Sequence, residues 1–168
     1  MSGIARRIAL CVGLVPALLL PAAMAGAEDA GVQAFRDWAL RCPTGAGCSL
    51  EQRIFTPGAA TPLMLLSLQR AGGERRLMAA VRVPLNVVLP EGLAIAVDGD
   101  APQKVPFHHC REEGCFAIFP VPERLGRRLR AGTTALLTVQ LLDGNRLSLP
   151  ASLMGVTAGL RALGDAGQ

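Results

Sequence analysis

The placement of the cysteines is the feature that most constrains how this chain can fold. Cys11 lies alone near the N-terminus, and the other four of the five cysteines form two closely spaced pairs, Cys42 with Cys48 and Cys110 with Cys115. Neither pair has the Cys-x-x-Cys spacing of a thiol oxidoreductase, and turn-forming residues separate the two members of each pair. The pattern is typical of an exported, oxidised protein that is braced by disulfides.

The pairing itself stays open at the level of sequence, because four cysteines allow three connectivities. Local pairing, Cys42 with Cys48 and Cys110 with Cys115, is favoured because neighbours across a turn lie at the Cα separation that a disulfide requires. In the loop-entropy model a local bridge contributes roughly 2 kcal/mol, and a long-range bridge from Cys42 to Cys115 about 4 kcal/mol. Local bridges would therefore rigidify turns more than they hold the fold together.

The N-terminus has the pattern of an export signal. Arg6 and Arg7 precede an apolar run over residues 8–20, and small residues follow at the expected cleavage site. The run is short for a membrane-spanning helix and is interrupted by proline, which makes a retained anchor the less favoured alternative. We expect cleavage after Ala25, with Ala27 as a second acceptable site.

Removal of a signal over residues 1–25 leaves residues 26–168, a length that suits a single domain. The chain has 17 Lys and Arg against 13 Asp and Glu, but Arg6 and Arg7 belong to the signal, so the mature protein is nearly balanced in charge. This balance and export together argue against a nucleic-acid partner.

Short alternating segments predict a mainly β protein, a sandwich or barrel. The expected strands cover residues 35–42, 48–55, 62–68, 77–83, 93–97, 105–110, 115–119, 134–142 and 146–149. The turn Asp143-Gly144-Asn145 predicts a hairpin between the last two strands, and the Gly-rich residues 71–74 predict another.

Two helices are expected near the C-terminus. The first runs from Pro122 to Arg130 and carries Arg124, Arg127 and Arg128 on its polar face, which is either solvated or in peripheral contact with envelope lipids. The second runs from Ser152, as N-cap, to Leu163, with Gly164 ending it. Gly155 and Gly159 have the spacing of a membrane helix-dimer motif, but the segment is short and contains Arg161, so close packing against a sheet is the favoured use.

Chemical sites are hard to assemble from this sequence. The only histidines, His108 and His109, adjoin Cys110, but neighbouring strand residues point to opposite faces, so a metal site competes poorly with a disulfide. Asp98 and Asp100 fit a turn better than a calcium loop, because the loop's acidic twelfth position is missing. We expect no catalytic, metal-binding or cofactor-binding residues.

Six segments of the mature chain stand in a distinctive order. They are Asp37-Trp38-Ala39-Leu40-Arg41-Cys42, Cys48 with Gln52, Val97-Asp98-Gly99, Pro106-Phe107, Gly114-Cys115-Phe116-Ala117 and Ser152-Leu153-Met154-Gly155. In this order and spacing the chain resembles the invasion-associated locus B family over nearly the whole mature length. Val156 departs from the family, in which Phe usually follows the last segment.

The resemblance implies an immunoglobulin-like antiparallel β-sandwich, periplasmic, secreted or associated with the outer membrane of a Gram-negative bacterium. No catalytic residues are established for the family, and the matching positions are interpreted as architecture, with Trp38, Phe107 and Leu153 in the core. The implied function is an exported, non-enzymatic envelope protein that binds an envelope or host-surface protein, linked in pathogenic members to host-cell association or invasion. The alternatives are a periplasmic factor for envelope integrity and an uncharacterised hydrolase. The oligomeric state is not predicted.

Overall fold

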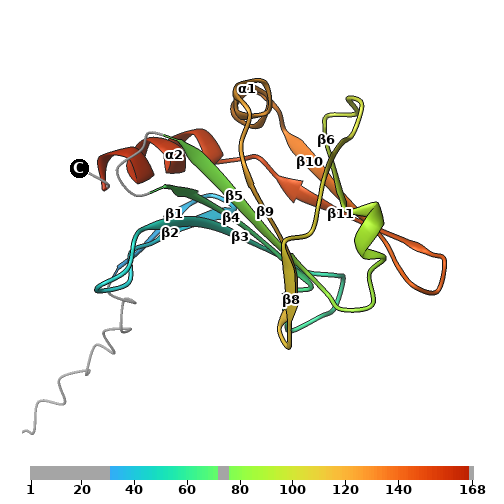
Figure 1. The fold of residues 1–168 in the computed structure, drawn as a ribbon. Helices are drawn as coiled ribbons and strands as arrows, with labels where there is room; N and C mark the ends of the chain where they lie inside the picture. The colour runs from blue at the N-terminus through green and yellow to red at the C-terminus, as the bar shows by residue number, and fades with distance from the viewer. Residues whose placement is uncertain (1–30, 72–75, 167–168) are drawn as a thin grey trace, which may run out of the picture.

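The computed structural model describes residues 31–71 and 76–166, so the predicted export signal over residues 1–25 lies outside the described residues. The described residues form two antiparallel β-sheets packed face to face, with two short helices (Figure 1). The predicted class, a mainly antiparallel β-sandwich with short helices near the C-terminus, is confirmed.

The larger sheet has seven strands in the order β1-β2-β3-β4-β5-β9-β8, and the smaller has four in the order β11-β10-β6-β7. The first sheet consists of β1 (Val32–Phe35), β2 (Trp38–Arg41), β3 (Ser49–Ile54), β4 (Met64–Arg70), β5 (Leu77–Val83), β8 (His109–Arg111) and β9 (Gly114–Pro120). The second consists of β6 (Leu93–Val97), β7 (Gln103–Val105), β10 (Thr134–Gln140) and β11 (Arg146–Ser152). A single turn of 3₁₀ helix, Leu89–Glu91, precedes β6.

The core lies between the sheets because alternate residues of each strand face inward. In β5 the buried residues are Ala79, Val81 and Val83, and in β10 they are Ala135, Leu137 and Val139. Both runs were predicted from their alternation. Ladder pairing of β10 with β11 and of β4 with β5 confirms the two predicted hairpins.

Helix α1 (Glu123–Ala131) begins after Pro122 and is followed by Gly132, close to the prediction. Helix α2 (Val156–Asp165) differs from its prediction at the N-terminus. Ser152 is not an N-cap, because it pairs with Thr134 as the last residue of β11, and Gly164 lies inside the helix rather than ending it. The ladder to β10 keeps this segment extended for longer than local propensity indicates.

Helix α2 covers the inner face of the seven-stranded sheet near β1 to β4 (Figure 1). Its buried residues include Val156, Leu160 and Leu163. A Cβ atom at Gly159 would lie 2.5 Å from Leu50 Cδ1, so the missing side chain is what lets α2 approach β3 closely. This confirms the predicted use of the glycine in packing against a sheet.

Two predicted strands are wrong in extent. Residues 35–42 do not form one strand: the chain turns at Arg36, whose φ is 55°, and Phe35 pairs with Trp38 across a hairpin between β1 and β2. Residues 105–110 are likewise divided, because the chain leaves the smaller sheet after β7 and enters the larger one at β8. Pro106, which has no backbone N–H to donate, stands at this crossing.

Both disulfides are local. Cys42 is bonded to Cys48 and Cys110 to Cys115, with Cα separations of 4.2 Å and 4.0 Å respectively. The first spans the connection between β2 and β3, and the second crosses the β8–β9 hairpin. The first bridge therefore braces a connection near one edge of the seven-stranded sheet, and the second braces the hairpin at the opposite edge.

Candidate functional site

Three segments far apart in the sequence converge at the end of β11. The indole Nε1 of Trp38 donates a hydrogen bond to the backbone carbonyl oxygen of Ser152 at 2.9 Å. The side-chain amide of Gln52 donates to the same oxygen at 2.9 Å and to the Asp37 carbonyl oxygen at 3.3 Å. Trp38 and Gln52 are buried, so their N–H groups need protein acceptors, and these carbonyl oxygens supply them.

The side chain of Ser152 completes this arrangement. Its hydroxyl donates to the Asp37 carboxylate at 2.6 Å and accepts a hydrogen bond from the Met154 amide at 3.2 Å. Farther along the chain, Gly155 lies so close to the β1–β2 turn that a Cβ atom would be 1.9 Å from the Phe35 carbonyl oxygen. We call these residues, Asp37, Trp38, Gln52, Ser152 and Gly155, the clasp.

The buried side chains of the clasp are an indole and an amide, neither of which is a nucleophile or a proton donor of useful pKa. Its hydroxyl and carboxylate, on Ser152 and Asp37, bond to each other. It fastens the N-terminal hairpin β1–β2 to the connection between β11 and α2. Of the other predicted core residues, Leu153 is buried and Phe107 is half-buried against the core.

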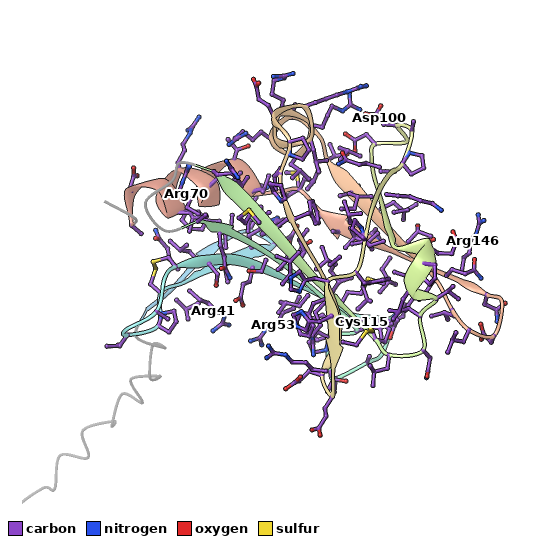
Figure 2. The ribbon with its side chains drawn as sticks, in the orientation of Figure 1. Arg41, Arg53, Arg70, Asp100, Cys115 and Arg146 are labelled. Carbon is purple, nitrogen blue, oxygen red and sulfur yellow. A yellow bond between two sulfur atoms is a disulfide. The ribbon has the colours of Figure 1, made fainter. Side chains whose placement is uncertain are left out.

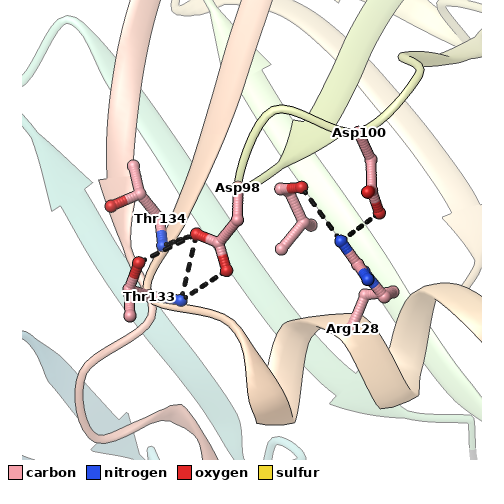
Figure 3. Close-up of polar contacts among 6 residues, drawn as sticks. Asp98, Asp100, Arg128, Thr133 and Thr134 are labelled. Carbon is pink, nitrogen blue, oxygen red and sulfur yellow. Dashed lines mark hydrogen bonds and ion pairs between the residues drawn. The ribbon is translucent and has the colours of Figure 1, made fainter.

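A second polar cluster fixes the β6–β7 turn to the segment after α1 (Figure 3). The Asp98 carboxylate accepts hydrogen bonds from the backbone amides of Thr133 and Thr134, at distances from 2.9 to 3.2 Å, and from the Thr133 hydroxyl at 2.8 Å. Asp100 forms an ion pair with Arg128 of α1. The two acids therefore serve a turn, as predicted, and face protein donors.

The hydrogen bonds to Asp98 make the stability of the folded protein depend on pH in a way that can be tested. The Thr134 amide, followed by the Thr133 hydroxyl and amide, lowers the pKa of the Asp98 carboxyl below its ordinary value. The ionised form is thus favoured by folding, and its contribution to stability is present above pH about 4 and is lost as the pH falls through the lower folded-state pKa.

We therefore expect Asp98→Asn to be less stable than the parent protein at neutral pH and to lose less stability on acidification below pH about 4. Urea unfolding midpoints measured at a series of pH values give both quantities. Asp165→Asn, which removes a carboxylate at the exposed end of α2, is the matched control. An identical acid dependence in Asp98→Asn and the parent protein would contradict the assignment.

The two histidines lie at the surface, next to β9. Their Nδ1 atoms are 2.9 Å apart, so each ring's hydrogen-bond partner in the structure is the other histidine. The His109 ring also stacks on Phe116 with 4.9 Å between centroids. Across the described parts of the chain, no group of three or more His, Cys, Asp or Glu residues is placed to hold a metal ion. A hydrolase centre would need an acid or hydroxyl partner for one of these rings, and among the described residues the hydrogen bond of each ring is to the other histidine.

The arginines of α1 are partly neutralised. Arg127 pairs with Glu123 one turn earlier at 2.5 Å, and Arg128 pairs with Asp100. Arg124 is exposed on the same helix. The contact of this face with envelope lipids stays a prediction, with two of its three cations already engaged in ion pairs within the protein.

A shallow hollow of about 500 Å³ lies between the N-terminal hairpin and the end of α2. It is lined by small and apolar residues, one amide and one acid, namely Gly31, Val32, Gln33, Leu40, Cys42, Ala162, Asp165 and Ala166. Because it combines one carboxylate with a disulfide and aliphatic groups, it offers no pair of groups for acid–base or nucleophilic chemistry.

Both sheets carry apolar residues on their outward faces. On the smaller sheet the hydrogen-bonded Thr138 and Ser148 lie beside a row formed by Ala96, Leu136 and Pro150. The larger sheet presents an apolar group from its central strands β4, β5 and β9, which we call the outer patch: Leu65, Met78, Ala80, Phe116 and Ile118. Figure 2 shows Arg41 and Arg53 on this side of the sheet, away from α2. Ile118 is the exposed member of the outer patch, and the other four residues are half-buried.

The described residues thus form a two-sheet β domain braced by two local disulfides. The chain is a member of the invasion associated locus B (IalB) protein family, whose family model matches residues 38–164. That match contains every segment from which the resemblance was predicted, apart from Asp37.

The fold is also similar to a solved structure. The crystal structure of invasion associated protein B from Bartonella henselae matches with a TM-score of 0.72 and 17% sequence identity, covering 80% of this chain and 96% of that one. At this identity the match shows the shared fold alone. A comparison with curated proteins found no match.

Proposed function

We propose that this protein is an exported, non-enzymatic interaction module of the cell envelope. The observation that carries the proposal is the outer patch, an apolar group on the neighbouring strands β4, β5 and β9 that includes the exposed Ile118. A solvated antiparallel sheet is ordinarily polar on its outward side, so apolar residues there favour a surface that is covered by a partner.

Export is supported by the residues themselves and by the disulfides. Two local disulfides form and persist in an oxidising compartment, and the N-terminal pattern is that of a cleaved signal. Within residues 31–71 and 76–166, none of the helices has both the length and the apolar character needed to cross a membrane. The name of the Bartonella protein suggests a role in invasion. In a pathogen, the interaction that we propose for this chain is association with host cells.

Location tests the proposal and separates its forms. Fractionation of the host bacterium should place the protein in the periplasm, the outer membrane or the medium, with a new N-terminus at Gly26 or Glu28. Protease added to whole cells degrades a surface-exposed adhesin and spares a periplasmic factor for envelope integrity. Full-length protein retained in the cytoplasm, with all four mature cysteines reduced, would refute the proposal.

A further inference from the structure

Basic side chains accompany the outer patch in a single cross-strand row. The register pairs Arg53 with Leu65, Leu65 with Arg82, Arg82 with Phe116, and Phe116 with His109. Since these residues are paired across neighbouring strands, their side chains share the outward face of the sheet. Arg53 and Arg82 lie two strands apart, which places their backbones about 10 Å from each other.

Neither arginine has its charge neutralised within the described residues. Arg53 is exposed and forms no ion pair in this part of the chain. Arg82 donates from Nη1 to the Glu113 carbonyl oxygen at 3.2 Å, while its Nε is buried with no hydrogen-bond partner. The buried Nε is out of reach of a docked molecule, but Arg82 and Arg53 keep their positive charges, which an anionic group on a partner would neutralise.

The apolar residues beside Arg53 and Arg82 restrict which class of molecule could bind here. Ala80 and Ile118 form the adjacent row, and Ile118 is 38% exposed. A sulfated glycan would match the arginines but would leave these aliphatic groups without a counterpart. A protein segment that carries both carboxylates and apolar side chains matches both features, as apolar centres with complementary charges do at protein interfaces.

A second copy of this chain fits the same surface poorly. Among the strand residues of this outward face, Glu51 is the only acid, and it is paired with Arg41 at 3.4 Å. A two-fold contact of the face with itself would bring Arg53 and Arg82 against other cations, which is destabilising.

We propose that the outer patch, with Arg53 and Arg82, is the docking surface for an acidic protein segment that also carries apolar side chains. This inference rests on the proposed function, since it names the kind of partner that the interaction module binds. The partner's carboxylates lie against the two guanidinium groups and its apolar side chains against Phe116 and Ile118.

Site-specific photo-crosslinking in living cells separates this inference from the proposed function. A photoreactive residue replaces Ile118 in one variant and Leu136 in the other, since these two residues are 38% and 42% exposed on the outward faces of the two sheets. Adducts from position 118 with an acidic protein segment, and none from position 136, are expected. Adducts from position 136 alone would overturn the inference and spare the proposed function, and an absence of adducts from both would count against both.

Binding of defined probes to the purified mature protein tests the chemistry. A synthetic peptide of alternating Glu and Leu should bind and should shift the amide NMR resonances of the outer patch, while a Lys-and-Leu peptide should not. Arg53→Glu should weaken binding about tenfold or more, whereas Arg124→Glu, at an exposed arginine of α1, should leave it unchanged.

Three outcomes would overturn the proposed chemistry. One is equal binding by Arg53→Glu and the parent protein. Another is tighter binding to a heparin oligosaccharide or to phosphatidylglycerol vesicles than to the acidic peptide. The last is concentration-dependent dimerisation that protects the outer patch from solvent exchange.

Discussion

Replacing Gly155 with alanine is expected to lower the free energy of unfolding by at least about 3 kcal/mol. The added Cβ would stand 1.9 Å from the Phe35 carbonyl oxygen, and Gly155 has a φ of 97°, a conformation that side-chain-bearing residues rarely adopt. Relief of the clash requires the N-terminal hairpin to move away from the β11–α2 connection, which opens the clasp. Urea or guanidinium unfolding followed by circular dichroism measures the loss.

Gly144→Ala is the matched control for this result. Gly144 has a similar φ of 87° in the β10–β11 turn, but a Cβ there would meet nothing within 4 Å. Its replacement carries the backbone strain without the clash and should cost about 1 kcal/mol. Similar losses in the two variants would show that Gly155 is needed only for its backbone conformation, and that the close contact with Phe35 does not contribute.

Replacing Trp38 with alanine should destabilise the protein by about 3–5 kcal/mol, because it leaves a large cavity at a fully buried position. Trp38→Phe should cost less, on the order of 1–3 kcal/mol, since the ring is largely retained and the Ser152 carbonyl oxygen keeps its hydrogen bond from Gln52. Far-UV circular dichroism is the appropriate probe, because Trp38 is the only tryptophan of the chain.

A control at the surface completes this series. Leu136→Ala truncates a side chain that is 42% exposed on the smaller sheet and should change stability by about 0.5 kcal/mol or less.

If Trp38→Phe were as destabilising as Trp38→Ala, the indole hydrogen bond rather than the packing of the ring would dominate at position 38.

Elements fixed by nearby residues were predicted well. The β10–β11 hairpin follows from the alternation of Ala135, Leu137 and Val139 and from the turn at Gly144, both of which act over a few residues. The end of α1 at Gly132 has an equally local cause.

The errors arose where distant residues overrule local preference. Ser152 has the propensity of an N-cap, yet its ladder partner Thr134 keeps it in β11 and its hydroxyl bonds to Asp37, 115 residues earlier in the sequence. The division of residues 105–110 has the same kind of cause, because each half of that segment pairs with a different sheet. Neither pairing leaves a signal in the segment itself.

The family segments were recognisable in the sequence, but their role was not. Order and spacing identified Asp37-Trp38, Gln52 and the Ser152–Gly155 segment as belonging together, and the structure shows that they meet in the clasp. The outer patch was not predicted, because its residues come from β4, β5 and β9 and share a face only through the register of three strands.

The sequence alone determined the β class, the pattern of an exported, disulfide-bearing chain and family membership, because these depend on residue type, local alternation and spacing. Only the tertiary structure decided which strands lie side by side. Strand pairing is set by contacts between residues that are distant in the chain, and it is this pairing that places Trp38 beneath Ser152 and aligns Arg53 with Arg82 on one outward face.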